Sequence, residues 1–185
     1  MEKNRCKWVD NTKIYQEYHD NEWGKPVHCD IKLFEMLSLE VFQAGLSWKT
    51  ILKKREYFKK AFDNFNPNII AKYNNEKYVK LLENENIIRN KLKISATINN
   101  AQRFLEIQKE YGSFDKFIWS YVDNIQIKNT KEDIDIPTKT ALSDKISKEL
   151  KNKGFKFVGS TIIYSYLQSI GIVNDHSKNC YLYSR

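Results

Sequence analysis

Glycine and proline are scarce in this sequence, with 6 Gly and 3 Pro among 185 residues. A fold built from many short strands needs both residues at its turns, so a turn-rich β-sandwich or barrel is disfavoured. Apolar runs of about 18 residues, the length needed to span a bilayer, are also absent. The opening residues, MEKNRCKWVD, lack the pattern of a signal peptide. We therefore expect a soluble, cytoplasmic protein.

Cysteine is equally rare, with only Cys6, Cys29 and Cys180 in the chain. An odd number of cysteines without a secretion signal argues against a disulfide framework. The remaining roles for these residues are buried thiols or metal ligands.

The charge balance is strongly basic, because 31 Lys and Arg face 23 Asp and Glu and leave a net charge of +8. Such a surface fits a polyanionic partner such as a nucleic acid, and the alternative is a lysine-rich surface that is merely well solvated. A hydrophobic content of 41% and an aromatic content of 14% indicate a packed globule. No repeat or linker divides the chain, so residues 1–185 are predicted to form one domain.

Apolar residues recur at intervals of three and four through most of the chain, which predicts an all-α fold of seven to nine helices. Six polar residues are placed to start helices: Asp30, Ser47, Asn66 before Pro67, Asn75, Ser113 and Ser143. Four glycines are placed to interrupt or end them: Gly45, Gly112, Gly154 and Gly171. Residues 124–139 are predicted to be a loop.

Two cysteines and two histidines lie near the two chain ends, at Cys6, His19, His176 and Cys180. Two thiolates and two imidazoles complete a closed tetrahedral zinc site, whose natural role is structural. The spacing of four between the last two residues lets one helical turn or a tight loop bring them together. Ordinary buried cysteines and polar histidines are the alternative, and His28–Cys29 is a competing pair of ligands.

Aromatic residues gather around one acid in the first 48 residues, where Glu40 is accompanied by Trp8, Tyr15, Tyr18, Trp23 and Trp48. Tryptophan and tyrosine offer faces that stack on a flat, electron-poor ring, such as a base drawn out of its helix. Apolar neighbours in sequence indicate that Glu40 is buried, and a buried carboxylate needs donors or a cation. The alternative is a helix-surface glutamate beside core aromatics.

A short polar segment, ENENIIRN at residues 83–90, separates two predicted helices and is followed by basic residues. The first turn of the second helix offers free backbone N–H groups to a phosphate, and Arg89, Lys91 and Lys93 add positive charge. A solvated helical turn is the alternative.

Together these stretches resemble the 3-methyladenine DNA glycosylase I family of base-excision repair enzymes. The resemblance runs almost end to end through RCKWV, YHDNEWG, LFEMLSLEVFQAGLSWKTILKKRE, IIRN, SDKISKEL, KGFKFVGSTI and IVNDH. It implies a helix-hairpin-helix glycosylase fold in which a structural zinc, one per chain, joins residues 1–30 to residues 160–185. The zinc ligands it implies are Cys6, His19, His176 and Cys180.

The same resemblance assigns the pocket residues. It places Glu40, kept as a carboxylate, against the modified adenine, with Tyr18 and Trp48 at the base and with Trp8, Tyr15 and Trp23 lining the pocket. Tyr15 and Trp23 could instead only support Glu40 and the pocket wall. The expected enzyme is a monofunctional, monomeric glycosylase that hydrolyses the N-glycosidic bond of 3-methyladenine in alkylated double-stranded DNA.

Five residues are predicted to contact DNA: Gln43, Leu46, Asn86, Arg89 and Lys91. Gln43 and Leu46 belong to QAGLS and would fill the vacated stack and wedge the duplex, unless Leu46 is core and Gln43 only caps a helix. The family usually has glycine in place of Asn86 and often a small residue in place of Lys7. Because Asn tolerates a left-handed conformation, we expect the hairpin to survive.

Two rival functions remain open. One is a zinc-stapled, non-catalytic module that binds damaged DNA, which would have little need of Glu40 beside a polyanion. The other is a basic helical RNA-binding protein. No Asp occurs between Asp63 and Asp115, where other helix-hairpin-helix glycosylases place the residue that activates water, so hydrolysis is expected to rest on substrate lability, stacking and electrostatics.

Overall fold

The computed structural model describes residues 3–129 and 136–183. Their helices are α1 (Lys13–Asn21), α2 (Asp30–Gln43), α3 (Trp48–Ala61), α4 (Pro67–Ile70), α5 (Asn75–Glu83), α6 (Lys91–Tyr111), α7 (Phe114–Trp119), α8 (Ala141–Asn152) and α9 (Ser160–Ser169). Two short 3-10 turns, η1 (Asp63–Phe65) and η2 (Ser120–Val122), and two short strands, β1 (Ile127–Lys128) and β2 (Val173–Asn174), complete these elements. The predicted all-α class is confirmed.

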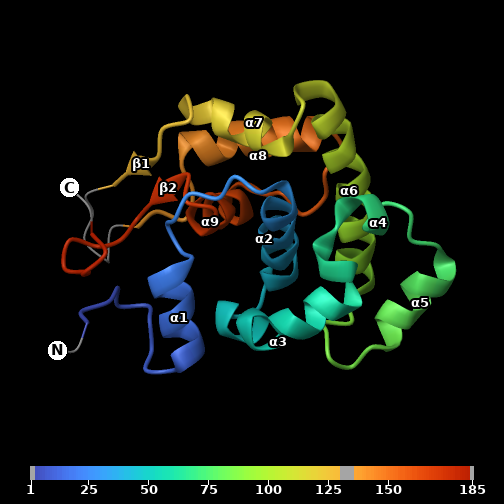
Figure 1. The fold of residues 1–185 in the computed structure, drawn as a ribbon, viewed down its shortest axis with the longest axis horizontal. Coiled ribbons are helices and arrows are strands. Elements are labelled where there is room, and N and C mark those ends of the chain that lie inside the picture. Colours follow the sequence, from blue (N-terminus) through green and yellow to red (C-terminus); the bar gives the residue numbers. More distant parts are fainter. Residues whose placement is uncertain (1–2, 130–135, 184–185) are drawn as a thin grey trace.

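Helix α2 lies at the centre of the molecule, and α3, α6 and α9 pack against it (Figure 1). Every residue from Leu33 to Phe42 is buried, so the helix is covered on all sides rather than along one stripe. The burial includes two glutamates, Glu35 and Glu40. Burial of an unpaired carboxylate is unfavourable in free energy, so both glutamates are candidates for an ion pair or for a functional role.

Most predicted helix boundaries are confirmed. Ser47 and Ser113 accept hydrogen bonds from the backbone of their own first turns, and Asn66 does so ahead of Pro67. Gly112 ends α6 in the left-handed conformation, with φ +87°.

Two caps are placed wrongly by local reasoning. Asp30 is the first residue of α2, and its carboxylate accepts hydrogen bonds from the backbone N–H groups of Phe114 and Asp115 at 2.9 and 2.8 Å. It therefore caps α7, a different helix. Ser143 lies inside α8, where it forms a capping box with the true N-cap, Thr140.

The predicted loop at residues 124–139 contains a strand. β1 pairs in parallel with β2, with Ile127 opposite Val173, so the loop prediction is wrong at residues 127–128. Residues 130–135 of that segment lie outside the described residues. Val173 is 46 positions from its partner Ile127, so the local sequence pattern could not predict the pairing.

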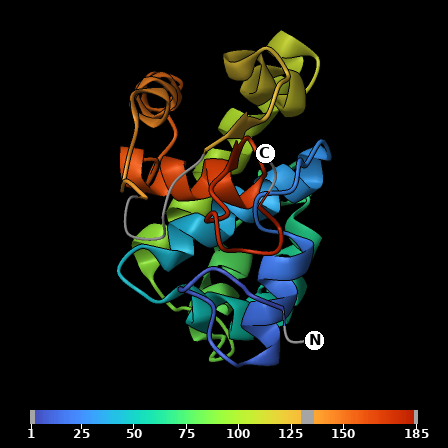
Figure 2. The same ribbon diagram turned by 90° about the vertical axis from the view of Figure 1, so that its left-hand side faces the viewer.

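The two ends of the chain lie at the same end of the molecule (Figure 1). Viewed from that end, the red segment after α9 lies beside the blue N-terminal segment (Figure 2), and the Tyr181 N–H donates to the Asn4 carbonyl at 2.8 Å. Gly171 permits a further close approach, because a Cβ there would lie 2.1 Å from the Lys25 carbonyl carbon.

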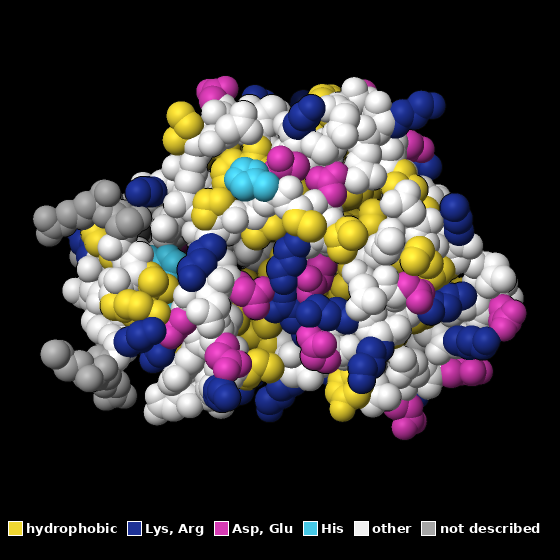
Figure 3. All heavy atoms as spheres, in the orientation of Figure 1, with side chains coloured by type: hydrophobic (Ala, Val, Ile, Leu, Met, Phe, Trp, Pro, Cys, Tyr) yellow, Lys and Arg dark blue, Asp and Glu magenta, His cyan; other side chains and the backbone are white. Residues whose placement is uncertain are grey.

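Charge on the face seen in Figure 1 is mixed. Lysine and arginine side chains are interspersed with aspartate and glutamate over this face (Figure 3), so the excess of positive charge is not gathered into one patch there. None of the described helices is long and apolar enough to cross a membrane.

Candidate active site and metal cluster

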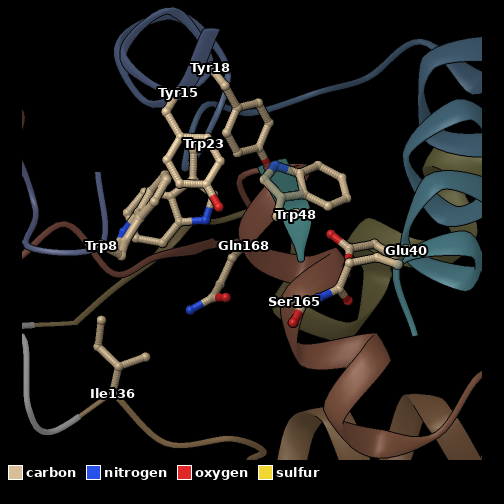
Figure 4. Close-up of a pocket in the computed structure, with 10 residues that line it drawn as sticks. Trp8, Tyr15, Tyr18, Trp23, Glu40, Trp48, Ile136, Ser165 and Gln168 are labelled. Carbon is tan, nitrogen blue, oxygen red and sulfur yellow. The ribbon is translucent and has the colours of Figure 1, made fainter. Parts of the chain in front are cut away.

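A pocket of about 210 Å³ opens between α1, α2, α3 and α9 (Figure 4). It is smaller than the roughly 300–1,000 Å³ of pockets for drug-sized ligands, so it suits one small ring system. All five aromatic residues expected around Glu40 line it. The full lining is Trp8, Tyr15, Tyr18, Trp23, Glu40, Gln43, Trp48, Ile136, Ser165 and Gln168.

Glu40 is 3% exposed, and its carboxylate makes no hydrogen bond or ion pair with any described residue. Burial alone raises the pKa of Glu40 from 4.5 to about 8. With the pocket free, the protonated acid is therefore favoured at neutral pH. Burial therefore opposes the carboxylate form that the resemblance implies, and a donor or a cation in the pocket would favour that form.

Aromatic rings form two sides of the pocket. Tyr18 and Trp48 lie together, with ring centroids 5.3 Å apart, on the side of Glu40 (Figure 4). Across from them Trp8 packs edge-on against Tyr15 at 5.5 Å and against Trp23 at 5.0 Å. The indole N–H groups of Trp8 and Trp48 are buried without a hydrogen-bond partner among the described residues. The pocket walls are thus built largely of aromatic rings, the kind of side chain on which a base stacks.

A network of charges behind the pocket, which the sequence analysis missed, joins α1, α2 and α3. Arg55 donates two hydrogen bonds to Glu22, at 2.8 and 2.7 Å, and one to Glu35 at 2.7 Å. Lys32 bridges the same two carboxylates at 3.0 and 3.1 Å. Although burial opposes it, the Arg55 guanidinium lowers the pKa of Glu22 to about 2. Two cations therefore balance two carboxylates and fix the helices that carry Tyr18, Glu40 and Trp48.

Three of the four expected metal ligands come together at the chain ends. The ligand atoms of Cys6, His19 and Cys180 lie within 4.8 Å of one another, and all three residues are buried. Hydrogen bonding from Cys6, followed by that from His19, lowers the pKa of the Cys180 thiol to about 4 against the effect of burial. This direction favours the thiolate form of Cys180, which is the form of cysteine that binds metals.

The imidazole of His19 is oriented as a metal-binding histidine is. Its Nδ1 lies 2.9 Å from Asp20, whose carboxylate is held by two hydrogen bonds of 2.8 Å from Arg5. This arrangement turns Nε2 toward the Cys180 sulfur, 3.4 Å away. A carboxylate behind a ligand histidine is a common feature of zinc sites.

His176, the fourth expected ligand, lies beside the cluster. Its ring packs edge-on against that of His19, with centroids 4.9 Å apart, and its Nδ1 is 2.8 Å from the Asn174 side-chain oxygen. That contact places the proton on Nδ1 and leaves Nε2 as a free acceptor. Nε2 is buried without a hydrogen-bond partner among the described residues. The competing pair is elsewhere: Cys29 is exposed, and His28 contacts Asp115.

The loop between α2 and α3 carries the two residues expected to open the duplex. Leu46 is 39% exposed, so it is not a core residue, and Gln43 lines the pocket. The Gln43 amide donates to the Leu46 carbonyl at 3.1 Å and closes the turn. A Cβ on Gly45 would meet nothing within 4 Å, which leaves this tip open to a partner.

Two lysines hold the hairpin at residues 84–90 against its neighbours. Lys54 donates to the Asn86 carbonyl at 3.0 Å, and Lys93 donates to the carbonyls of Phe42 and Ala44 at 2.8 and 2.6 Å. Lys93 is 6% exposed. The expectation that it adds charge for a phosphate is therefore wrong, because its ammonium group caps the end of α2.

The remaining hairpin residues are exposed. Asn86, Arg89 and Lys91 lie at the surface, and Arg89 contacts Glu85 at 3.5 Å. Asn86 is not among the described residues with positive φ, so it does not use the left-handed conformation allowed for it. Its N–H instead donates to the Asn84 side chain at 3.0 Å, which stabilises the turn.

Residues 8–183 match the family model for methyladenine glycosylase. The chain belongs to this family. A curated relative, DNA-3-methyladenine glycosylase 1 of Escherichia coli (strain K12), is 46% identical over 180 residues, which are 97% of this chain and 96% of the relative. DNA-3-methyladenine glycosylase of Haemophilus influenzae is 45% identical over 177 residues, 95% and 96% of the two chains. The solved structure of 3-methyladenine DNA glycosylase I from Staphylococcus aureus is 37% identical, with a TM-score of 0.94 over 98% of this chain and 97% of that one.

Three pocket residues of this methyladenine glycosylase family member were missed by the sequence analysis: Ile136, Ser165 and Gln168. Ser165 and Gln168 are three residues apart and so share one face of α9. That spacing was visible, but the apolar residues between and around them indicated only a buried helix. Nothing local indicated which face of α9 meets the aromatic cluster.

Proposed function

We propose that this protein is a monofunctional DNA-3-methyladenine glycosylase, which hydrolyses the N-glycosidic bond of 3-methyladenine in alkylated DNA. Membership of the methyladenine glycosylase family and relatives of 45–46% identity with that activity in their names support the proposal. The observation that carries it within this chain is Glu40, a buried acid in an aromatic pocket whose carboxylate has no partner among the described residues.

Charge explains why such a pocket suits an alkylated base. Adenine methylated at N3 in DNA is cationic, so aromatic faces attract it and an adjacent carboxylate pairs with it. Entry of the cation favours the ionised form of Glu40, whose pKa burial holds near 8 in the free pocket. A neutral base lacks this charge. The ionised form of Glu40 is therefore favoured by a cationic, damaged base and not by a neutral one.

The cationic base is already a good leaving group. Water adds its oxygen to C1′, the C1′–N9 bonding pair leaves with the base as 3-methyladenine, and the proton of the water passes to solvent. The pocket lining among the described residues contains Glu40 as its one acid and no lysine, in keeping with hydrolysis rather than strand cleavage through an amine. Stacking between Trp48 and the opposite wall holds the flipped base, at about 1–3 kcal/mol per ring.

We propose that the metal cluster binds one structural zinc through Cys6, His19, His176 and Cys180. The donor set fits this ion, and Nε2 of His176, which has no hydrogen-bond partner among the described residues, supplies the fourth donor atom that the three clustered residues lack. Bound zinc would tie residues 1–30 to residues 160–185 and complete a single domain. It takes no part in the hydrolysis.

DNA is proposed to lie across the loop that carries Gln43 and Leu46 and the hairpin at residues 84–90, which together with α5 and α6 forms the helix-hairpin-helix motif. Leu46 is exposed where an intercalating side chain must be, and Gln43 borders the pocket that the flipped base enters. Asn86, Arg89 and Lys91 are exposed for phosphate contacts. Lys54 and Lys93 keep the loop and the hairpin in fixed register.

The function is tested by incubating the protein with methylated duplex DNA and chromatographing the released bases. Release of 3-methyladenine with formation of abasic sites and no strand cleavage is expected. Tight binding to methylated duplex without release would favour a non-catalytic damage-binding module, and equal binding to unmethylated RNA would favour an RNA-binding protein. With either binding pattern, the absence of 3-methyladenine release rejects the proposed activity.

A further inference from the structure

Gln168 projects from α9 into the pocket, with its side-chain oxygen on the side of Ser165 and Glu40 (Figure 4). Its amide nitrogen donates a hydrogen bond of 2.7 Å to Asp175. The oxygen accepts no hydrogen bond from any described residue. It is therefore a second polar acceptor, besides Glu40, that is available to a bound ring.

Asp175 determines which way that amide points. It is 2% exposed and accepts three hydrogen bonds, from Tyr164 at 2.5 Å, from Asn129 at 2.6 Å and from Gln168. A carboxylate accepts and cannot donate, so the amide must turn its NH₂ toward Asp175 and its oxygen toward the pocket. A reversed amide would set its oxygen against the carboxylate in a buried site, which is strongly unfavourable.

Tertiary structure supplies both of the other donors. Asn129 follows β1, and the pairing of β1 with β2 brings it beside Asp175, where its N–H also donates to the Asn174 carbonyl at 3.0 Å. Tyr164 is 2% exposed on the buried side of α9 and does not line the pocket. Asp175 is thus fixed by groups that have no contact with a ligand.

We infer that Gln168, held by Asp175, is a specificity residue that accepts a hydrogen bond from the 6-amino group of the adenine ring and excludes rings with a carbonyl at that position. The inference rests on the proposed function and adds a discrimination between 3-methyladenine and 3-methylguanine. Glu40 accepts one hydrogen of the amino group, and Gln168 accepts the other.

The discrimination depends on whether the group at position 6 of the purine ring donates or accepts hydrogen bonds. A 6-amino group brings two donors to two acceptors, whereas a 6-carbonyl brings lone pairs against lone pairs and leaves buried acceptors unpaired. A site built to hydrogen-bond a donor rejects an analogue that lacks it more strongly than an apolar pocket does. Glu40 alone could take a proton and become a donor, whereas an amide fixed by Asp175 cannot change its character.

The test compares excision of 3-methyladenine and 3-methylguanine from methylated duplex by wild type and Gln168→Met, which keeps the side-chain length and removes the acceptor. We expect kcat/KM for 3-methyladenine to fall about tenfold and that for 3-methylguanine to be unchanged or higher. The matched control is Gln108→Met, which removes a glutamine-to-aspartate hydrogen bond, to Asp30 at 2.6 Å, outside the pocket lining. It is expected to lower the melting temperature and to leave the ratio of the two activities at the wild-type value.

A folded Gln168→Met protein with the wild-type ratio would overturn the inference. If that variant does not fold, Asp175→Asn replaces it, because an amide at 175 can donate and frees the Gln168 amide to turn. The same loss of selectivity is then expected, and a wild-type ratio with full metal content overturns the inference. If the wild-type protein releases no 3-methyladenine, the proposed function has failed. If it does and the variants keep its selectivity, only the role of Gln168 is wrong.

Discussion

Trp23 packs edge-on against His176, with ring centroids 4.8 Å apart. Trp23 is a wall of the pocket, and His176 lies beside the cluster of Cys6, His19 and Cys180. The next residue, Gly24, approaches the same imidazole so closely that a Cβ would lie 2.8 Å from its Cε1. Trp8 adds a second contact, with its ring centroid 5.4 Å from that of His19. The positions of the His19 and His176 rings therefore help to set the positions of Trp8 and Trp23, and so the shape of the pocket.

Zinc removal is expected to lower the melting temperature. It is also expected to weaken binding of free 3-methyladenine, because the imidazoles of His19 and His176, which contact Trp8 and Trp23, are then no longer held by the metal. Metal analysis should find one zinc per chain, and calorimetry with and without a chelator measures the stability change. Full zinc content in the double variant His176→Ala/Cys180→Ser would contradict the assigned ligands.

Glu40→Gln is expected to fold normally and to lose about 100-fold in kcat/KM for 3-methyladenine, the scale on which single electrostatic contacts act. The amide keeps the size of the side chain and lacks the negative charge that pairs with the cationic base. Excision assays on methylated duplex measure the loss. Wild-type excision by this variant would reduce Glu40 to a structural residue.

The same substitution has the opposite effect on stability. The pKa of Glu40 is about 8 in the folded protein and 4.5 ordinarily, so folding favours the protonated acid. Its stabilising effect is full below pH 4.5 and is lost as pH rises to about 8, at a total of roughly 3–5 kcal/mol. Gln mimics the protonated acid at every pH. Urea unfolding should therefore show Glu40→Gln to be more stable than wild type at pH 9 and equal to it near pH 4; a constant difference would refute the shift.

Leu46→Ala is expected to lose more activity on methylated duplex than on methylated single strand, since only the duplex must be opened. The melting temperature should change little, because the side chain is 39% exposed. Ile125→Ala is the control, as Ile125 is a more exposed apolar residue, at 69%, outside the pocket lining. Equal losses on the two substrates would show that Leu46 does not wedge the duplex.

Gly171→Ala is expected to be far more destabilising than Gly45→Ala. Both glycines have positive φ, at +71° and +77°, so backbone strain of about 1 kcal/mol is common to both. At Gly171 the new Cβ would also lie 2.1 Å from the Lys25 backbone, whereas at Gly45 it meets nothing within 4 Å. Urea unfolding should give a difference of more than 2 kcal/mol. Similar values would mean that the contact with Lys25 relaxes freely.

Much of the secondary structure could be predicted because its causes are local. Helical spacing of apolar residues, the caps Ser47 and Ser113, and the left-handed Gly112 act within one or two turns of chain. Asp30 shows the limit of prediction from local sequence. Its residue type predicted a cap, but the N-terminus that it caps belongs to α7, more than 80 positions away.

The candidate site divides in the same way. Sequence by itself pointed to the pocket aromatics, to Glu40 and to four candidate metal ligands, because these residue types have distinctive chemistry wherever they stand. Only the tertiary structure decided that Lys93 is a buried cap, that the Glu40 carboxylate meets no partner in residues 3–129 and 136–183, and that Gln168 faces the pocket. A pKa, an amide orientation and an ion pair depend on atoms that meet through space, and the neighbours of Glu40 and Gln168 come from helices far apart in the chain.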